Sequence, residues 1–283
     1  MPRLSFLLAL LLSAAVAVAQ GTNLKVVSWN IRDLGRSKSD EEVELMARLL
    51  RGYDIIAIQE VVAGDRAGAQ AVARLAAALD RKGADYDYRV SDPTQSSSGH
   101  IRERYAFLWR TSTVQLVGRP ALMSAFAKTV EREPFLAQFE WAGKRLRVAN
   151  FHARPHDQQP EREIARFKTM PDAYPDAPLL LLGDFNVPSH HTVFHPWVRR
   201  GYQVVLAGQP TTLRRRLPED GEDVYYHESD NILVPAHQVR VWERGILDVV
   251  QYCHNSGYVD EGGLRMANAL SDHAPVYVVL SDF

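Results

Sequence analysis

Five short polar clusters follow apolar runs in this chain, and their residue types suit metal and phosphate chemistry. The clusters are Ser28-Trp29-Asn30, Gln59-Glu60, Asn150-Phe151-His152, Gly183-Asp184-Phe185-Asn186 and Ser271-Asp272-His273. Carboxylate and amide oxygens hold hard divalent cations, and histidines transfer protons near neutral pH. Each cluster is expected where a strand leaves a sheet, and ligands of layered α/β folds gather at strand ends. The order of the clusters therefore favours one site that cleaves a phosphoester bond with the help of a metal ion.

The acidic and amide side chains divide into metal ligands and substrate contacts. Glu60 and Asp272 are the candidate anionic ligands, with Asn30 as a neutral ligand or a donor that fixes their geometry. Asp184 and Asn186 lie in one turn, where they can aim water and stabilise a phosphoryl oxygen. Each residue alone has a plainer explanation, such as a loop cap or an Asx-turn. Their joint occurrence favours function, with Mg²⁺ or Mn²⁺ as the cofactor.

Two of the ten histidines are candidates for catalysis. A lone histidine is more often structural, and we expect that role for the other eight. His152 and His273 end two of the polar clusters, so one imidazole can act as general acid or base while the other stabilises the charge of the transition state.

The elements that must position these clusters alternate between helix and strand patterns. Strands are predicted at 24–29, 55–58, 178–182, 231–234 and 275–280, and helices at 39–52, 66–79 and near Pro160. Segments 105–109 and 113–117 predict a hairpin, and 135–141 and 145–151 flank the turn signal Ala142-Gly143-Lys144. Helices that cover strands in both α-linked and hairpin pairs indicate an α/β fold with two packed sheets between helical layers.

The first 19 residues are typical of a secretory signal peptide. Arg3 precedes a short apolar run, and Ala17-Val18-Ala19 is a small-x-small cleavage site, so we expect cleavage after Ala19. The run is short for the roughly 20 residues of a membrane anchor, which is the alternative explanation. We expect a secreted or periplasmic protein without stable membrane association after the signal is removed. Residues 20–283 then fit a single domain, which we expect to be a monomer.

Net charge and cysteine content limit the remaining options. The formal net charge of −1 gives no overall attraction to nucleic acid, so a polyanion must be held by a local patch or by the metal. Arg214-Arg215-Arg216 is a candidate patch, although such a run is more often a solvated loop. The single cysteine, Cys253, excludes an internal disulfide, so stability must come from the core.

From about Leu24 to Leu280 the clusters resemble the endonuclease/exonuclease/phosphatase superfamily, and within it the DNase I-like branch. The early Asn, the Gln-Glu, the His after a strand, Gly-Asp-Phe-Asn and the final Ser-Asp-His all occur in the family's order. The resemblance implies a four-layered α/β/β/α sandwich with two packed mixed sheets. It also implies that Glu103 is the carboxylate partner of His152, that Asp230 orients His273, and that Arg132 contacts a substrate phosphate.

Three departures from the DNase I pattern concern the groove-reading side chains, the disulfides and the calcium loop. Val62 stands where that branch has an arginine, and Ile101 stands where it has a tyrosine that reads the minor groove. The family's disulfides are absent. Its calcium loop is not recognisable, because Gln209 precedes Thr211-Thr212 where an acidic ligand is expected. Duplex DNA is therefore less strongly indicated than phosphodiester hydrolysis itself.

The sequence favours an exported nuclease that cuts DNA or another phosphodiester. One alternative is a phosphatase or a lipid or inositol phosphoesterase on the same fold, against which we find no exposed aromatic hairpin suited to a membrane. Another is an inactive binding module. It is disfavoured because every catalytic position that can be matched holds a competent residue.

Overall fold

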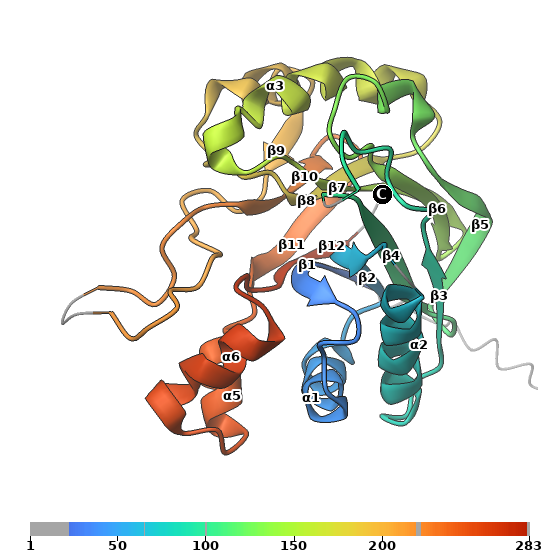
Figure 1. Cartoon of the computed structure of the whole chain (residues 1–283). Helices are drawn as coiled ribbons and strands as arrows, with labels where there is room; N and C mark the ends of the chain where they lie inside the picture. Colours follow the sequence, from blue (N-terminus) through green and yellow to red (C-terminus); the bar gives the residue numbers. More distant parts are fainter. Residues whose placement is uncertain (1–22, 65, 100, 219–221, 282–283) are drawn as a thin grey trace, which may run out of the picture.

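The computed structural model describes residues 23–64, 66–99, 101–218 and 222–281, so the predicted signal peptide lies outside the described residues. Two six-stranded sheets pack face to face between helical layers (Figure 1). The first sheet has the order β11-β12-β1-β2-β4-β3 and the second has the order β5-β6-β7-β8-β10-β9. This is the predicted α/β/β/α sandwich with two mixed sheets.

The strands of the first sheet are β1 (Leu24–Leu34), β2 (Ile55–Val62), β3 (Tyr86–Val90), β4 (Glu103–Arg110), β11 (Arg240–Ile246) and β12 (Val276–Ser281). Those of the second are β5 (Val114–Leu122), β6 (Phe135–Trp141), β7 (Lys144–His152), β8 (Leu179–Asp184), β9 (Tyr202–Val204) and β10 (Asp230–Pro235). The α-helices are α1 (Asp40–Leu50), α2 (Ala67–Asp80), α3 (Glu161–Ile164), α4 (His195–Val198), α5 (Val249–Asn255) and α6 (Leu264–Leu270). Short 3₁₀ segments lie at Ser124–Phe126, His156–Gln158, Ala165–Ala173, Thr192–Phe194 and Asp260–Gly263.

Helix α1 forms where the sequence predicts it. The Ser39 hydroxyl accepts from the backbone N–H of Glu42, and the Glu42 carboxylate accepts from the backbone N–H of Ser39, which completes a capping box. Its apolar face, including Val43 and Met46, is buried against the first sheet together with residues of α2, α5 and α6.

Three apolar layers hold the sandwich together. One lies between the first sheet and helices α1, α2, α5 and α6, and another lies between the second sheet and the segments around α3 and α4. The central layer joins the two sheets. In β2, Ile56 and Ile58 face the helices while Ile55 and Ala57 face the central layer, which explains the continuous apolar run of this strand.

The predicted hairpin of segments 105–109 and 113–117 is wrong. These segments form β4 and β5, which belong to different sheets: β4 pairs with β2 and β3, whereas β5 pairs with β6. The short connection at 111–113 therefore carries the chain from one sheet to the other. The second predicted hairpin is confirmed, because β6 and β7 pair antiparallel through Ala142-Gly143, both with positive φ.

Candidate active site

Asn30 and Glu60 are brought together by the parallel pairing of β1 and β2, because both residues lie toward the carboxyl ends of these neighbouring strands. The pairing registers shift after Asn30 and after Ile58, and Glu60 has a φ of 59°. Left-handed backbone at a residue other than glycine is strained, and such strain concentrates at functional sites. The Asn30 amide Nδ2 donates to Glu60 Oε1 at 3.0 Å and to Asp184 Oδ2 at 3.1 Å, and so connects the two sheets.

Asp184 follows Gly183, where the backbone of β8 leaves no room for a side chain beside its parallel neighbour β7. Gly183 has a φ of 135°, and a Cβ atom there would lie 1.8 Å from the carbonyl oxygen of Phe151. Asp184 Oδ1 accepts from the backbone N–H of Asn186 at 3.0 Å, so the Asx-turn considered from the sequence does form. This bond occupies one carboxylate oxygen, while Oδ2 accepts from Asn30 and faces both catalytic histidine candidates.

His152 pairs with Glu103, as the resemblance implies. The imidazole Nδ1 lies 2.9 and 3.1 Å from the two carboxylate oxygens of Glu103, and Nε2 lies 3.4 Å from Asp184 Oδ2. Burial lowers the pKa of His152, but the Glu103 carboxylate outweighs this effect and raises the pKa above its ordinary value. With Nδ1 held by a carboxylate, Nε2 is the ring atom directed into the site.

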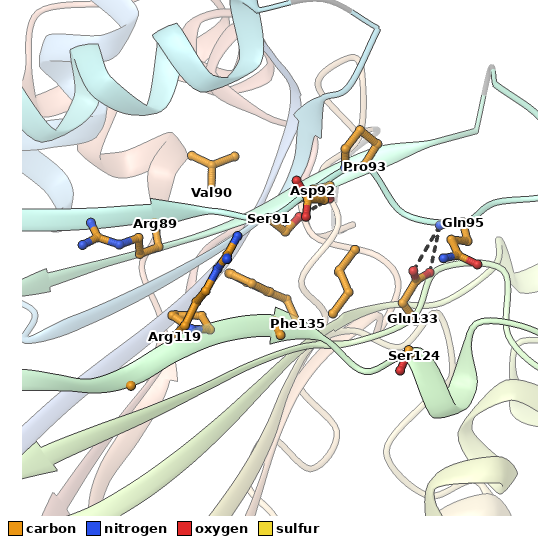
Figure 2. Close-up of a pocket in the computed structure, with 14 residues that line it drawn as sticks. Arg89, Val90, Ser91, Asp92, Pro93, Gln95, Arg119, Ser124, Glu133 and Phe135 are labelled. Carbon is orange, nitrogen blue, oxygen red and sulfur yellow. Dashed lines mark hydrogen bonds between the residues drawn. The ribbon is translucent and has the colours of Figure 1, made fainter.

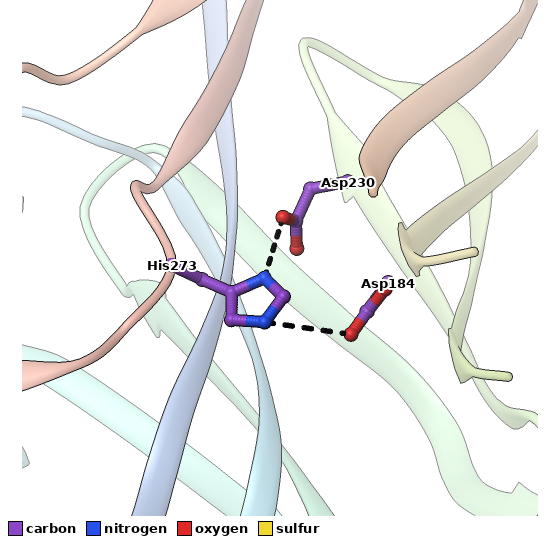
Figure 3. Close-up of side chains that lie close together, drawn as sticks. All are labelled: Asp184, Asp230 and His273. Atoms are coloured by element: carbon purple, nitrogen blue, oxygen red, sulfur yellow. Dashed lines mark hydrogen bonds and ion pairs between the residues drawn. The ribbon is translucent and has the colours of Figure 1, made fainter. Parts of the chain in front are cut away.

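His273 repeats the same arrangement with Asp230 (Figure 3). Its Nδ1 lies 2.7 Å from Asp230 Oδ2, which also accepts from the hydroxyl of Thr211 at 2.7 Å, and its Nε2 lies 3.8 Å from Asp184 Oδ2. Burial lowers the pKa of His273, but Asp230 and Asp184 more than offset this effect, and the pKa is raised to about 10. Burial raises the pKa of Asp230, whereas His273 and the Thr211 hydroxyl both favour its charged form.

Asp272, a candidate metal ligand, forms an ion pair with Arg32. Its Oδ2 lies 3.1 Å from Arg32 Nη1, and Arg32 also donates to the carbonyl of Asn268 at 3.0 Å. The segment that carries Asp272 is held against β1, because Trp29 Nε1 donates to the carbonyl of His273 at 2.7 Å and the Ser271 hydroxyl donates to the carbonyl of Asn30 at 2.6 Å. Asp272 thus borders the cluster while its charge is shared with a guanidinium.

The donor set around Asn30 fits a divalent cation. Asn30 Oδ1 is buried without a hydrogen-bond partner, which is rare for an amide oxygen and suits a neutral metal ligand. Burial raises the pKa of Glu60, and a cation beside that carboxylate would offset the cost of burying its charge. Asp184, Asp230 and His273 also place ligand atoms within 4.8 Å of one another, although His273 Nδ1 and Asp230 Oδ2 there already bond to each other.

Arg132 is buried, with contacts mainly inside the protein. Its Nε lies 3.2 Å from Glu103 Oε2, and its Nη1 donates to the carbonyl of Ala153 at 3.0 Å. Arg132 also lines a cleft of about 420 Å³ together with Glu60, His152 and the two positions that depart from DNase I, Val62 and Ile101. The guanidinium therefore fixes the Glu103 carboxylate and borders the space where a substrate would lie.

A larger cavity, of about 820 Å³, lies elsewhere, beside the edge strands β3 and β5 (Figure 2). Arg89, Asp92, Arg119 and Glu133 are among its lining residues, and Glu133 accepts from the backbone N–H of Gln95. The predicted site residues do not line this cavity. Cavity size is thus a poor guide here, and the convergent polar groups mark the site instead.

Two partners of the site residues were not expected from the sequence, and Gln59 and Asn150, although they belong to the polar clusters, had no assigned role. The sequence pattern associates Thr211 only with the position of a calcium loop, yet its hydroxyl donates to Asp230, and no local pattern marks Arg32 as the partner of Asp272. Gln59 donates to Asn150 Oδ1 at 2.5 Å, and Asn150 donates to the carbonyl of Ile58 at 3.0 Å, which ties the two sheets together beneath the site. For Gln59 and Asn150, a polar residue inside an otherwise apolar strand was the sequence signal for such a contact.

Comparison with known proteins agrees with this geometry. The model of the Endonuclease/Exonuclease/phosphatase family matches residues 27–273. A deoxyribonuclease of Thioalkalivibrio sp. is 32% identical over 96% of this chain and 74% of its own length. Mouse deoxyribonuclease-1-like 2 is 27% identical over 93% of this chain and 94% of its own. Among solved structures, the mannosyl-6-phosphatase of Bacteroides thetaiotaomicron has a TM-score of 0.63 at 19% identity, and covers 92% of this chain and 100% of its own. The chain therefore belongs to the endonuclease/exonuclease/phosphatase family and is a hydrolase that acts on phosphoester bonds.

Proposed function

We propose that the chain is a divalent-metal-dependent nuclease that hydrolyses DNA, with His152 as the proton-transfer group and His273 as the group that stabilises the charge of the transition state. One observation carries the proposal: each Nδ1 is held by its own carboxylate, and both Nε2 atoms face the same oxygen of Asp184, at 3.4 and 3.8 Å. Two oriented imidazoles that converge on one point suit a reaction that needs a proton transfer and a second positive charge.

The proposed reaction is the attack of water on the phosphorus of a phosphodiester. Asp184 and Asn186 orient the water, and the Asp184 carboxylate accepts its proton as the water oxygen binds phosphorus. His273 remains an imidazolium and stabilises the charge of the phosphoryl oxygens, in line with its raised pKa. As the bond between phosphorus and the leaving oxygen breaks, His152 donates its Nε2 proton to the departing alkoxide. Arg132 keeps Glu103 in place, and Glu103 in turn fixes the ring orientation of His152.

Asn30 and Glu60 would hold the metal ion, either Mg²⁺ or Mn²⁺. A bound divalent cation supplies positive charge that polarises the phosphoryl group and favours departure of the alkoxide. Asp272 remains a proposed ligand, but it must then exchange its contact with Arg32 for the ion.

DNA is the proposed substrate because the two sequence relatives described above are deoxyribonucleases and match most of this chain. The fold alone is less selective, since the mannosyl-6-phosphatase has a similar one. Phosphomonoester hydrolysis is therefore the second candidate. It requires the cleft beside Val62 and Ile101 to take a small sugar phosphate rather than a nucleic-acid strand.

The deciding experiment is a substrate panel with the purified protein. Supercoiled plasmid, single-stranded DNA, RNA, a small aryl phosphodiester and a sugar phosphate would each be tested with Mg²⁺, with Mn²⁺ and with chelator. We expect metal-dependent cleavage of DNA and of the small diester. Release of phosphate from the monoester alone, or full activity in chelator, would contradict the proposal.

We further propose export as a monomer. Residues 1–19 have the composition of a signal peptide, and the structure has no helix long and apolar enough to cross a membrane within its described residues. Mass spectrometry of the protein from the periplasm and the medium of its host should find an N-terminus at Gln20. An N-terminus at Met1 in the membrane fraction would contradict export. Sedimentation should give the mass of one chain.

A further inference from the structure

An exposed stack of four planar side chains lies beside the active site. Arg214 lies over the ring of Tyr226 at 5.2 Å from its centroid, the rings of Tyr226 and His227 are 4.2 Å apart, and those of His227 and His156 are 5.7 Å apart. The interplanar angles are 44° and 36° along the stack. Three of the four side chains are exposed, including Tyr226 at 44%. We call these four residues the aromatic stack.

The backbone holds the aromatic stack in place. Tyr226 and His227 lie on one arm of the segment between β9 and β10, which extends away from the sheets in Figure 1. The carbonyl of His227 accepts from Thr211 at 2.7 Å and from Thr212 at 3.2 Å, and Arg214 N–H donates to Val224 at 2.9 Å. Because these bonds fix the backbone of both arms of the segment, a partner that binds the stack has little ordering left to supply.

The aromatic stack is also close to the catalytic residues. His156 follows His152 by four residues and His227 precedes Asp230 by three, so the chain allows about 14 Å at most between each pair of Cα atoms. Thr211, which holds the carbonyl of His227, also donates its hydroxyl to Asp230. A nucleic-acid strand rises about 3.4 Å per nucleotide in a duplex, so the stack lies within a few nucleotides of the bond to be cleaved.

We propose that the aromatic stack binds unpaired bases next to the scissile phosphate and makes single-stranded nucleic acid the preferred substrate. Bases stack on exposed aromatic and guanidinium planes when they are free, whereas the bases of a duplex already stack on each other. Arg215 and Arg216 follow Arg214 and are exposed, which adds attraction for the backbone of the same strand. This proposal rests on the proposed nuclease function and specifies single-stranded nucleic acid as its substrate class.

The two imidazoles do not favour a metal ion as the occupant. Arg214 places a fixed positive charge in the stack. Burial lowers the pKa of His227 most, and the nearby charges of His156 and Arg214 lower it further. No carboxylate belongs to the stack. Among the described residues, the side chains that come close enough together to hold a metal ion are Asp184, Asp230 and His273, and none of them belongs to the stack.

The test compares Tyr226→Ala, Tyr226→Phe and His156→Ala with the wild type on a single-stranded oligonucleotide, its duplex and a small aryl phosphodiester. Loss of one stacking contact should raise KM for the single strand by about 5- to 150-fold and leave the small diester unchanged. Tyr226→Phe should behave as the wild type. Trp242→Ala is the matched control, because Trp242 is exposed on β11 with Arg240 stacked on its ring, and should change nothing.

An unchanged KM for the single strand in Tyr226→Ala would overturn the proposal, and so would an equal loss on the small diester. Fluorescence anisotropy with the same oligonucleotide in chelator separates this inference from the nuclease function. If the wild type cleaves no phosphodiester, the proposed function fails. Binding that still weakens in Tyr226→Ala then supports the stack, and binding that is unaffected refutes it.

Discussion

Neutralising Glu103 should slow the enzyme far less than removing His152. In Glu103→Gln the imidazole keeps a neighbour but loses the carboxylate that holds Nδ1 at 2.9 Å. A hydrogen bond to a charged group contributes about 1.5–3 kcal/mol and a neutral one about 0.5–1.5 kcal/mol, so the change costs about 1–2 kcal/mol. At about 1.4 kcal/mol per factor of ten, kcat should fall about 5- to 30-fold. His152→Ala removes the proton-transfer group and should cost about 10²- to 10⁴-fold.

The same substitution should change the titration of His152. Because the Glu103 carboxylate raises the pKa of the imidazole, Glu103→Gln should lower it, and the imidazole should lose its proton at a lower pH. The assay is the pH dependence of kcat on a small phosphodiester at saturating metal, together with NMR titration of the ring. The thermal transition should also fall, since Arg132 stays buried without its carboxylate.

Two controls make this prediction specific. His254→Ala, an exposed histidine of α5, should leave kcat unchanged. Circular dichroism of each variant should show a native fold. Equal losses in Glu103→Gln and His152→Ala, or an unshifted titration of His152, would refute the positioning role of Glu103.

Four further predictions concern other parts of the site. Gly183→Ala should strongly lower the melting temperature, because its Cβ would meet the Phe151 carbonyl at 1.8 Å; a native melting curve would show that the strands can move apart. Asn30→Ala should raise the Mg²⁺ concentration needed for half-maximal activity, and an unchanged metal titration would remove Asn30 from the ligands. In chelator, the stability contributed by protonated His273 should be fully present below pH 6.5 and should decline as the pH rises to about 10, because the unfolded chain loses the proton at a lower pH than the folded protein. Denaturant titrations of the wild type and His273→Gln across this pH range would show the decline, and equal pH profiles would contradict it. Val62→Arg should raise the rate on duplex DNA relative to single strands in the plasmid and oligonucleotide assays, and an unchanged ratio would mean that this position does not read the groove.

The sequence predicted the strands that carry the site because each combines an apolar run with a polar end. β2 and β8 are buried on both faces, and apolar runs this short that end in polar or turn residues are typical of buried strands. The edge strand β11 was not foreseen, since most of its side chains are exposed and its pattern resembles that of a loop. The failed β4–β5 hairpin has a related cause: a short turn between two β-rich segments does not encode whether they pair with each other or enter different sheets.

Partners of the site residues were harder to predict than the residues themselves. Glu103 and Asp230 came from the family resemblance, and the structure places both beside their histidines. The contact of Arg32 with Asp272 had no local signal, because the two lie 240 positions apart and meet only when β1 packs beside the segment before β12. Long-range polar contacts of this kind depend on register, which composition does not reveal.

Three polar pairs of the site join the two halves of the sandwich, with His273 contributed by the segment just before β12. Glu103 and His152, Asn30 and Asp184, and His273 and Asp230 all meet across the boundary between the two halves of the sandwich. A slide of one sheet against the other by a single residue, about 3.3 Å, would break all three pairs while leaving most apolar burial intact. Catalytic turnover therefore measures the alignment of the two sheets, and mild denaturant should abolish it before the secondary structure melts.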